Sequence, residues 1–75
     1  MDWITSSELG KFLIAHPDVE YECRMRIAGS IVSTHWWYYD SEHRCFQHSL
    51  DIKYSSVTQR DFQLYYKDCL WRIEL

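Results

Sequence analysis

Between Val19 and Ile27 the sequence alternates strictly between side chains that avoid water and side chains that carry charge. The first set is Val19, Tyr21, Cys23, Met25 and Ile27, and the second is Glu20, Glu22, Arg24 and Arg26. Because successive side chains of a strand point to opposite faces, this pattern predicts a β-strand over 19–27 with one wet face. Gly29 and Ser30 then predict a turn or bulge.

Two further segments have the character of strands. Residues 31–39, IVSTHWWYY, are rich in β-branched and aromatic side chains, which favour strands. A third strand is predicted from Cys45 to about Tyr54, with one face formed by Phe46, His48, Leu50, Ile52 and Tyr54. The short connections, with DSEHR at 40–44 as a hairpin loop, predict an antiparallel meander.

A helix precedes this sheet, and its start is well marked. Thr5 is placed as the N-cap, and Glu8 three residues later completes a capping box. Ile4 and Leu9 flank the cap at the spacing of a hydrophobic staple. Pro17 ends the helix, because proline has no backbone N–H and restricts the residue before it.

The last third of the chain allows two interpretations. Thr58 as N-cap with Asp61 three residues later predicts a second helix, over about 59–68. The competing β-hairpin rests on the alternation of Phe62, Leu64 and Tyr66. We favour the helix. In both cases LWRIEL at 70–75 predicts a final strand, with an inner face formed by Trp71, Ile73 and Leu75.

Together these elements predict one small α+β domain over residues 1–75, in the order α-β-β-β-α-β. Its antiparallel sheet has three to four strands and carries two helices on one face. The chain of 75 residues is 47% hydrophobic and 17% aromatic, which is the composition of a globular protein. A core this small adds only a few kcal/mol of stability without metal, disulfide or partner. Association with a second chain is therefore expected.

Charge and cysteine content narrow the classes of function. The formal net charge is −3 and the basic residues are scattered, which disfavours nucleic-acid binding because phosphate contacts need a basic patch. Three cysteines without a CxxC predict reduced thiols and a cytoplasmic protein. The sequence has neither an apolar run of membrane-spanning length nor a signal pattern, so no membrane contact is expected.

The aromatic run at 36–39 must place one pair of rings on each face of its strand. One pair fills the core, and the other either lies under arginine and lysine stems or forms a contact surface for a partner. The sequence leaves open which pair faces outward. All four rings, Trp36, Trp37, Tyr38 and Tyr39, are therefore interface candidates. The set we favour is Trp37 and Tyr39 with the hairpin residues Glu42, His43 and Arg44.

A cluster of His43, Cys45 and His48 raises the question of zinc, with His35 or Cys23 as a fourth ligand. The spacing H-x-C-x2-H matches no common structural zinc pattern, and strand geometry points His48 away from the other two. We therefore expect no metal and no cofactor. His48 is expected to be a hydrogen-bonded core histidine.

Catalytic residues are also not evident. Cys45 beside His43 or His48 has no marked orienting acid or oxyanion donor, so we expect no enzyme. The sequence instead favours a small, non-catalytic protein-binding module that occupies a surface of another protein. A phage or mobile-element inhibitor of a host defence protein would be one such module. The alternatives are a homo-oligomeric (for example homodimeric) accessory protein and a small zinc-binding domain.

Overall fold

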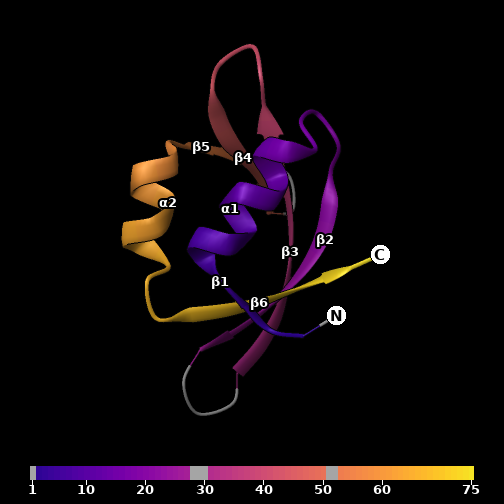
Figure 1. Cartoon of the computed structure of the whole chain (residues 1–75), viewed down its shortest axis with the longest axis vertical. Coiled ribbons are helices and arrows are strands. Elements are labelled where there is room, and N and C mark those ends of the chain that lie inside the picture. Colours follow the sequence, from indigo (N-terminus) through magenta and orange to yellow (C-terminus); the bar gives the residue numbers. More distant parts are fainter. Residues whose placement is uncertain (1, 28–30, 51–52) are drawn as a thin grey trace.

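The computed structural model describes residues 2–27, 31–50 and 53–75. Its elements are β1 (Ile4–Thr5), α1 (Ser6–Ala15), β2 (Tyr21–Ile27), β3 (Ile31–Asp40), β4 (Cys45–Leu50), β5 (Lys53–Val57), α2 (Gln59–Tyr65) and β6 (Cys69–Glu74). The described strands form one antiparallel sheet in the order β1-β6-β2-β3-β4-β5, which is strongly twisted and curls around the helices (Figure 1). The predicted small α+β domain with two helices is confirmed, but its sheet has six strands and not three to four.

The prediction of one strand from Cys45 to about Tyr54 is wrong. β4 ends at Leu50, and β5 runs back along it, with Leu50 opposite Lys53 and Phe46 opposite Val57. The segment has no glycine or asparagine, and Asp51 is not followed by glycine, so the usual dipeptide signals of a tight hairpin turn are missing. Asp51 and Ile52, predicted as strand residues, and Gly29 and Ser30, predicted as a turn, lie outside the described residues.

The first strand, β1, was not predicted because two residues are too few to show a period. Ile4 lies opposite Trp71 and Thr5 lies opposite Leu70 on β6. Thr5 is also the N-cap of α1. Its Oγ1 accepts a hydrogen bond from the backbone N–H of Glu8, and the Glu8 carboxylate accepts one from the N–H of Thr5, each at 3.2 Å. The predicted capping box is confirmed, and it marks the change from strand to helix.

The second helix is confirmed against the competing hairpin, although α2 ends at Tyr65 and not near 68. Thr58 Oγ1 accepts a hydrogen bond from the N–H of Asp61 at 3.2 Å, so the predicted N-cap is present. Phe62 is buried beneath the helix, while Leu64 and Tyr65 are exposed. Among the described residues, no helix has the length and apolar character needed to cross a membrane.

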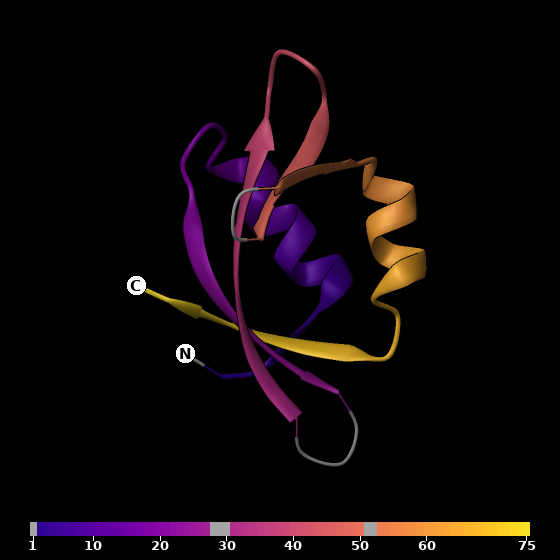
Figure 2. The ribbon, with the colours of Figure 1, turned by 180° about the vertical axis from the view of Figure 1, so that it is seen from behind.

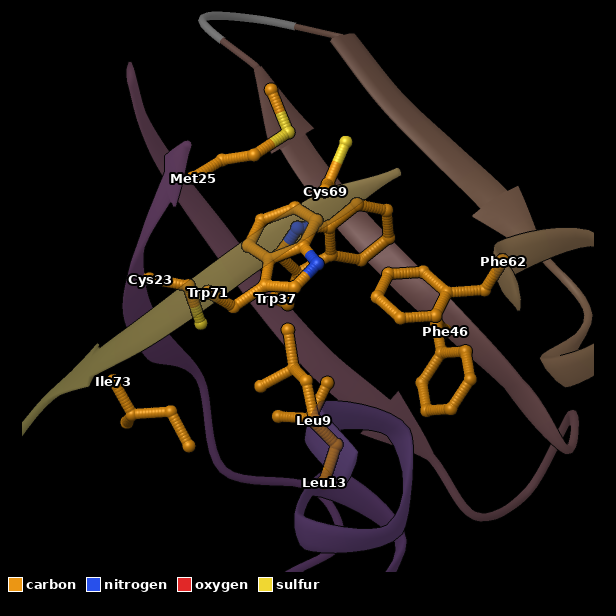
Figure 3. Close-up of a cluster of buried hydrophobic side chains, with 10 residues drawn as sticks. All are labelled: Leu9, Leu13, Cys23, Met25, Trp37, Phe46, Phe62, Cys69, Trp71 and Ile73. Carbon is orange, nitrogen blue, oxygen red and sulfur yellow. The ribbon is translucent and has the colours of Figure 1, made fainter. Parts of the chain in front are cut away.

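Both helices lie on the same face of the sheet (Figure 2), and the core fills the space between them and the strands. Figure 3 shows this cluster, which consists of Leu9, Leu13, Cys23, Met25, Trp37, Phe46, Phe62, Cys69, Trp71 and Ile73. α1 approaches the sheet closely at Gly10, where an added Cβ would lie 3.4 Å from the ring tip of Phe46. Glycine weakens a helix by about 1 kcal/mol relative to alanine, and a methyl group here would meet Phe46 at about ordinary van der Waals distance.

A buried serine joins three elements to one another. Ser6 Oγ, at the start of α1, donates a hydrogen bond to the carbonyl of Tyr66 at 2.6 Å. The same oxygen accepts a hydrogen bond from Nε1 of Trp71 at 2.8 Å. The first turn of α1, the end of α2 and the middle of β6 are thus held together at one atom.

The inner faces of β2 and β6 are buried as predicted along only part of each strand. Cys23 and Met25 are buried on β2, whereas Ile27 near the end of the strand is exposed. On β6 the inward prediction is confirmed for Trp71 and Ile73 and is wrong for Leu75, which is 85% exposed. Leu75 follows the last strand residue, so the alternation no longer sets its direction.

Candidate functional surface

The face of the sheet opposite the helices presents rows of side chains that the register defines. Trp36 lies opposite Glu22, and Glu22 lies opposite Glu74. The next row is Thr34, Arg24 and Arg72, and the one after it is Val32, Arg26 and Leu70. We call this surface, which also includes Trp3 and Tyr38, the outer face.

The aromatic run divides between the two faces as expected, but the pair that we favoured as the interface is wrong. Trp37 is completely buried, and Tyr39 is partly buried against the core, with its ring 5.5 Å from that of Phe46. The outward pair is Trp36 and Tyr38, and Trp36 is 42% exposed. Parity fixes which residues of β3 share a face, but only the register with β2 shows which face is inside.

Trp3 was missed by the sequence analysis because it precedes the first helix and belongs to no periodic segment. Two guanidinium groups lie over its ring, with Cζ of Arg26 at 4.8 Å and Cζ of Arg72 at 5.1 Å from the centroid. Such contacts attract a cation to the electron-rich face of an indole. Trp3 thereby anchors a group of arginines on the outer face.

Glu74 balances part of this positive charge. Its Oε1 lies 3.4 Å from Nε of Arg24 and 3.4 Å from an Nη atom of Arg72. Within the described ranges, Arg26 has no carboxylate partner. Its guanidinium contacts the ring of Trp3.

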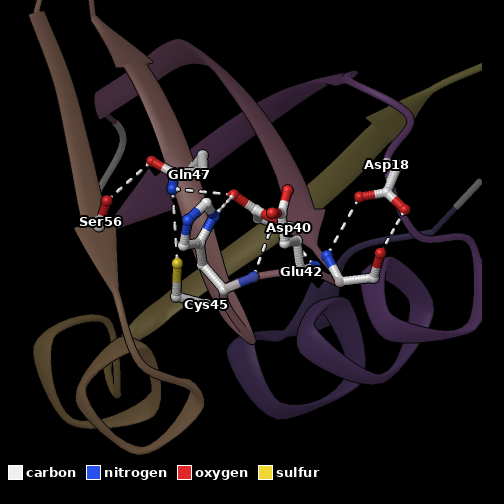
Figure 4. A network of polar contacts seen from close by, with 8 residues as sticks. Asp18, Asp40, Glu42, Cys45, Gln47 and Ser56 are labelled. Atoms are coloured by element: carbon white, nitrogen blue, oxygen red, sulfur yellow. Dashed lines mark hydrogen bonds and ion pairs between the residues drawn. The ribbon is translucent and has the colours of Figure 1, made fainter.

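The outer face of β3 leads to the hairpin tip, which we define as residues Ser41 to Arg44. Asp40 holds this turn from its base (Figure 4): Oδ1 accepts hydrogen bonds from the backbone N–H groups of Glu42 and His43, both at 3.1 Å. Oδ2 lies 2.8 Å from Nδ1 of His43. Arg44 adopts the left-handed backbone conformation, with φ 53°. Three of the predicted interface residues therefore lie on a turn with a defined shape.

A second carboxylate holds the hairpin tip from the side. Asp18, between α1 and β2, accepts hydrogen bonds from the N–H of Ser41 at 3.1 Å and from its hydroxyl at 2.6 Å. The N–H of Asp18 donates to the carbonyl of Tyr39 at 2.8 Å. The segment between α1 and β2 thus holds the same turn that Asp40 holds from within the hairpin.

The contact between His43 and Asp40 shifts the pKa values of the two side chains in opposite directions. The hydrogen bond and negative charge of Asp40 raise the pKa of His43 above its ordinary 6.5. The hydrogen bonds from His43 lower the pKa of Asp40 below its ordinary 3.8. Each shift reflects the mutual stabilisation of an imidazolium and a carboxylate.

The three zinc candidates are not brought together. His43 contacts Asp40, Sγ of Cys45 accepts a hydrogen bond from Gln47 at 3.4 Å, and His48 contacts His35. Across the described ranges no group of three or more histidine, cysteine, aspartate or glutamate side chains could hold a metal ion. The prediction that His48 is a hydrogen-bonded core histidine is confirmed, since the residue is buried and its Nε2 lies 2.8 Å from Nδ1 of His35.

Comparison with known proteins gives no match to a family model, a curated protein or a solved structure. The chemistry of the outer face and the hairpin tip is therefore the basis for a functional proposal.

Proposed function

We propose that this chain is a small, non-catalytic protein-binding module that acts by covering a surface of another protein. Its contact surface is the outer face around Trp36 and Tyr38, extended by the hairpin tip. The observation that carries this proposal is the position of Trp36, whose side chain is 42% exposed on the sheet face opposite both helices. A large indole on such a face gains free energy when a partner removes it from water.

The residue types on the outer face support a protein partner. Tryptophan, tyrosine and arginine dominate the binding energy of protein interfaces, and Trp36, Tyr38 and Arg24 bring all three types to one surface. Val32, also exposed, extends the apolar strip along β3. Charged side chains of β2 and β6 border this strip, as the polar rim does in known interfaces.

The charges of the outer face suggest the chemistry of the partner. The outer face carries three arginines, Arg24, Arg26 and Arg72, and two glutamates, Glu22 and Glu74. These five side chains therefore give the surface a positive excess, although the chain has a net charge of −3. A complementary partner surface has an apolar centre with carboxylates beside it. We propose a partner of that kind.

The hairpin tip adds a rigid element to the surface. The carboxylates of Asp40 and Asp18 hold its backbone before any partner arrives. Less conformational entropy is then lost on binding, so more of the contact energy appears as affinity. The exposed side chains of Glu42, His43 and Arg44 supply polar contacts of both signs. Inhibition of a host protein by a phage or mobile element would use such a surface, and that narrower function stays a prediction.

The test compares two exposed aromatic side chains on opposite sides of the molecule. A protein captured from an extract of the source cell is identified and purified, and its affinity for the chain is measured by calorimetry. Trp36→Ala should weaken binding at least about tenfold, as expected for an interface anchor. The matched control is Tyr65→Ala on α2, which is 71% exposed and should leave affinity unchanged.

The opposite pattern, in which Tyr65→Ala weakens binding and Trp36→Ala does not, would refute the proposed surface. Light scattering over a dilution series tests the alternative of self-association. A stable dimer that Trp36→Ala dissociates would make a second copy the occupant of the outer face.

A further inference from the structure

The inner face of β3 and β4 holds a hydrogen-bonded chain of three polar side chains that the proposed function does not use. Ser33 Oγ lies 2.8 Å from Nε2 of His35, and Nδ1 of the same imidazole lies 2.8 Å from Nε2 of His48. We call Ser33, His35 and His48 the serine relay. A hydroxyl, a base and a group that orients the base is the arrangement that activates serine nucleophiles.

Aromatic rings fix the orientation of both imidazoles. The ring of His48 is stacked on Trp37 at a centroid distance of 4.2 Å and an angle of 14°. His35 lies between His48, at 4.9 Å, and Trp71, whose ring meets it edge-on at 5.7 Å. Since both tryptophans are buried, the base cannot turn away from Ser33 without disturbing the core.

Strand geometry explains why these residues meet. Ser33 and His35 are two positions apart on β3 and therefore share its inner face. The register of β3 with β4 places His48 opposite Trp37, which makes it the diagonal neighbour of His35. The relay thus depends on a cross-strand pairing that sequence spacing alone does not reveal.

We propose that Ser33 is a nucleophile that accepts the acyl group of a small activated ester, with His35 as its base and His48 as the positioning residue. Ser33 Oγ forms a bond to the carbonyl carbon, and the bond from that carbon to the leaving oxygen breaks. The hydroxyl proton passes to Nε2 of His35 and then to the leaving oxygen. The products are one acyl-serine and one free alcohol or phenol, so the step needs no further reactant.

The ionisation states in this region suit the reaction. Burial lowers the pKa values of His35 and His48, so both imidazoles are neutral near pH 7, as a base must be. Cys23 lies opposite His35 on β2, and burial raises its pKa to about 12. The neighbouring sulfur is therefore a thiol and does not compete as a thiolate.

The described neighbours of Ser33 on β2 suggest the kind of acyl group. Met25 lies opposite Ser33 on β2, and Ile27 continues the same inner face two residues later. Ile27 is exposed, so this apolar surface is reachable from solvent. Ser33 itself is partly exposed. Because these described neighbours carry no charge, we expect a small, uncharged acyl group such as acetyl.

The experiment treats the whole chain with p-nitrophenyl acetate and follows nitrophenolate release, intact mass and peptide mapping. One acetyl ester per chain is expected, located on Ser33, and Ser33→Ala should abolish it. Ser56→Ala is the matched control, because this exposed hydroxyl donates to Gln47 and not to a histidine. Its acetylation rate should equal that of the unmodified sequence.

The roles of His35 as base and of His48 as positioning residue are tested by the rate of acetylation and its pH dependence. His35→Gln should slow acetylation at least about 100-fold, the lower range for general-base catalysis. His48→Gln should slow it and also move its pH dependence, which a purely structural role would not do. In the unmodified chain the rate should rise with pH through a pKa below 6.5, a measurement that does not depend on any variant folding.

Three results would overturn the proposal. The first is acetylation on lysine, cysteine or the amino terminus with none on Ser33. The second is an unchanged rate in folded His35→Gln, which would mean that His35 donates to the hydroxyl and does not accept its proton. The third is a rate at Ser33 that is independent of pH across the titration of His35.

Discussion

The imidazole of His48 lies almost parallel to the indole of Trp37, with 4.2 Å between ring centroids. Both residues are buried, and both belong to the inner face of the sheet. This stack assigns Trp37 to the core, and strand alternation then turns Trp36 outward. The same contact therefore separates the pair of rings on the inner face, Trp37 and Tyr39, from the pair on the outer face, Trp36 and Tyr38.

Neighbouring tryptophans should differ sharply in their contribution to stability. Trp37→Ala empties a completely buried site and should lower the free energy of unfolding by about 3–5 kcal/mol. Trp36→Ala removes a ring that is 42% exposed and should lower it by only about 1 kcal/mol or less. Urea unfolding followed by circular dichroism measures both values. Similar losses for the two variants would contradict the assignment of faces.

Loss of the Ser6 hydroxyl should destabilise the fold out of proportion to its size. Ser6→Ala leaves Nε1 of buried Trp71 without its acceptor and should lower the free energy of unfolding by about 1–3 kcal/mol. Ser7→Ala, at the neighbouring position of α1, is the control and should have a small effect. Thermal and urea unfolding of the two variants measure these losses. Equal losses of stability would contradict the stabilising role of the Ser6 hydroxyl.

The pKa of His43 and the pKa values of the relay histidines should be shifted in opposite directions. The Asp40 carboxylate raises the pKa of His43 above 6.5, whereas burial lowers the pKa values of His35 and His48 below it. NMR titration of the imidazole protons measures all three values. Asp40→Asn should move His43 back toward 6.5 and leave the relay histidines unchanged. A pKa of His43 below 6.5 would rule out the contact at the base of the hairpin tip.

The relay should make stability fall on acidification. The pKa values of His35 and His48 are lower in the folded state, so the unfolded chain binds protons first as pH falls. Stability should therefore be complete above pH 6.5 and decline as pH drops through 6.5 and the lowered folded values. Urea midpoints between pH 8 and pH 5 test the sign. His48→Gln should flatten the decline, and a midpoint that rises in acid would exclude this origin.

The pair of Asp40 and His43 should have the opposite pH dependence and stabilise the hairpin tip less as pH rises. The pKa of His43 is raised in the folded state, so its contribution is present below 6.5 and is lost as pH rises through the folded value. Hydrogen exchange of the backbone N–H groups of Glu42 and His43, corrected for intrinsic rates, should show weaker protection above that pKa. His43→Gln should remove this pH dependence, and unchanged dependence would point to another group.

Local signals made the two helices predictable. Thr5 and Thr58 cap them through hydrogen bonds between residues three positions apart, which sequence spacing reveals directly. β2 was predictable from alternation, and β3 from its β-branched and aromatic side chains. β5 was missed because its turn has no glycine or asparagine, and β1 because it has two residues.

The candidate site was less predictable because it depends on register between strands. The sequence indicated that 36–39 would supply one outward pair, but the choice between Trp36 and Trp37 requires the pairing of β3 with β2. The serine relay likewise forms only when β4 places His48 beside His35. Trp3 contacts arginines from β2 and β6, and no feature of the sequence around Trp3 predicts these contacts.

Site-specific photo-crosslinking is the most direct test of the outer face as a protein-binding surface. A photoreactive benzoylphenylalanine replaces Thr34, exposed between Val32 and Trp36, or in the matched control replaces Leu64, exposed on α2. The proposed function predicts that the purified partner crosslinks to position 34 and not to position 64. Crosslinking at 64 alone would contradict it and place the interface on the helical side of the molecule.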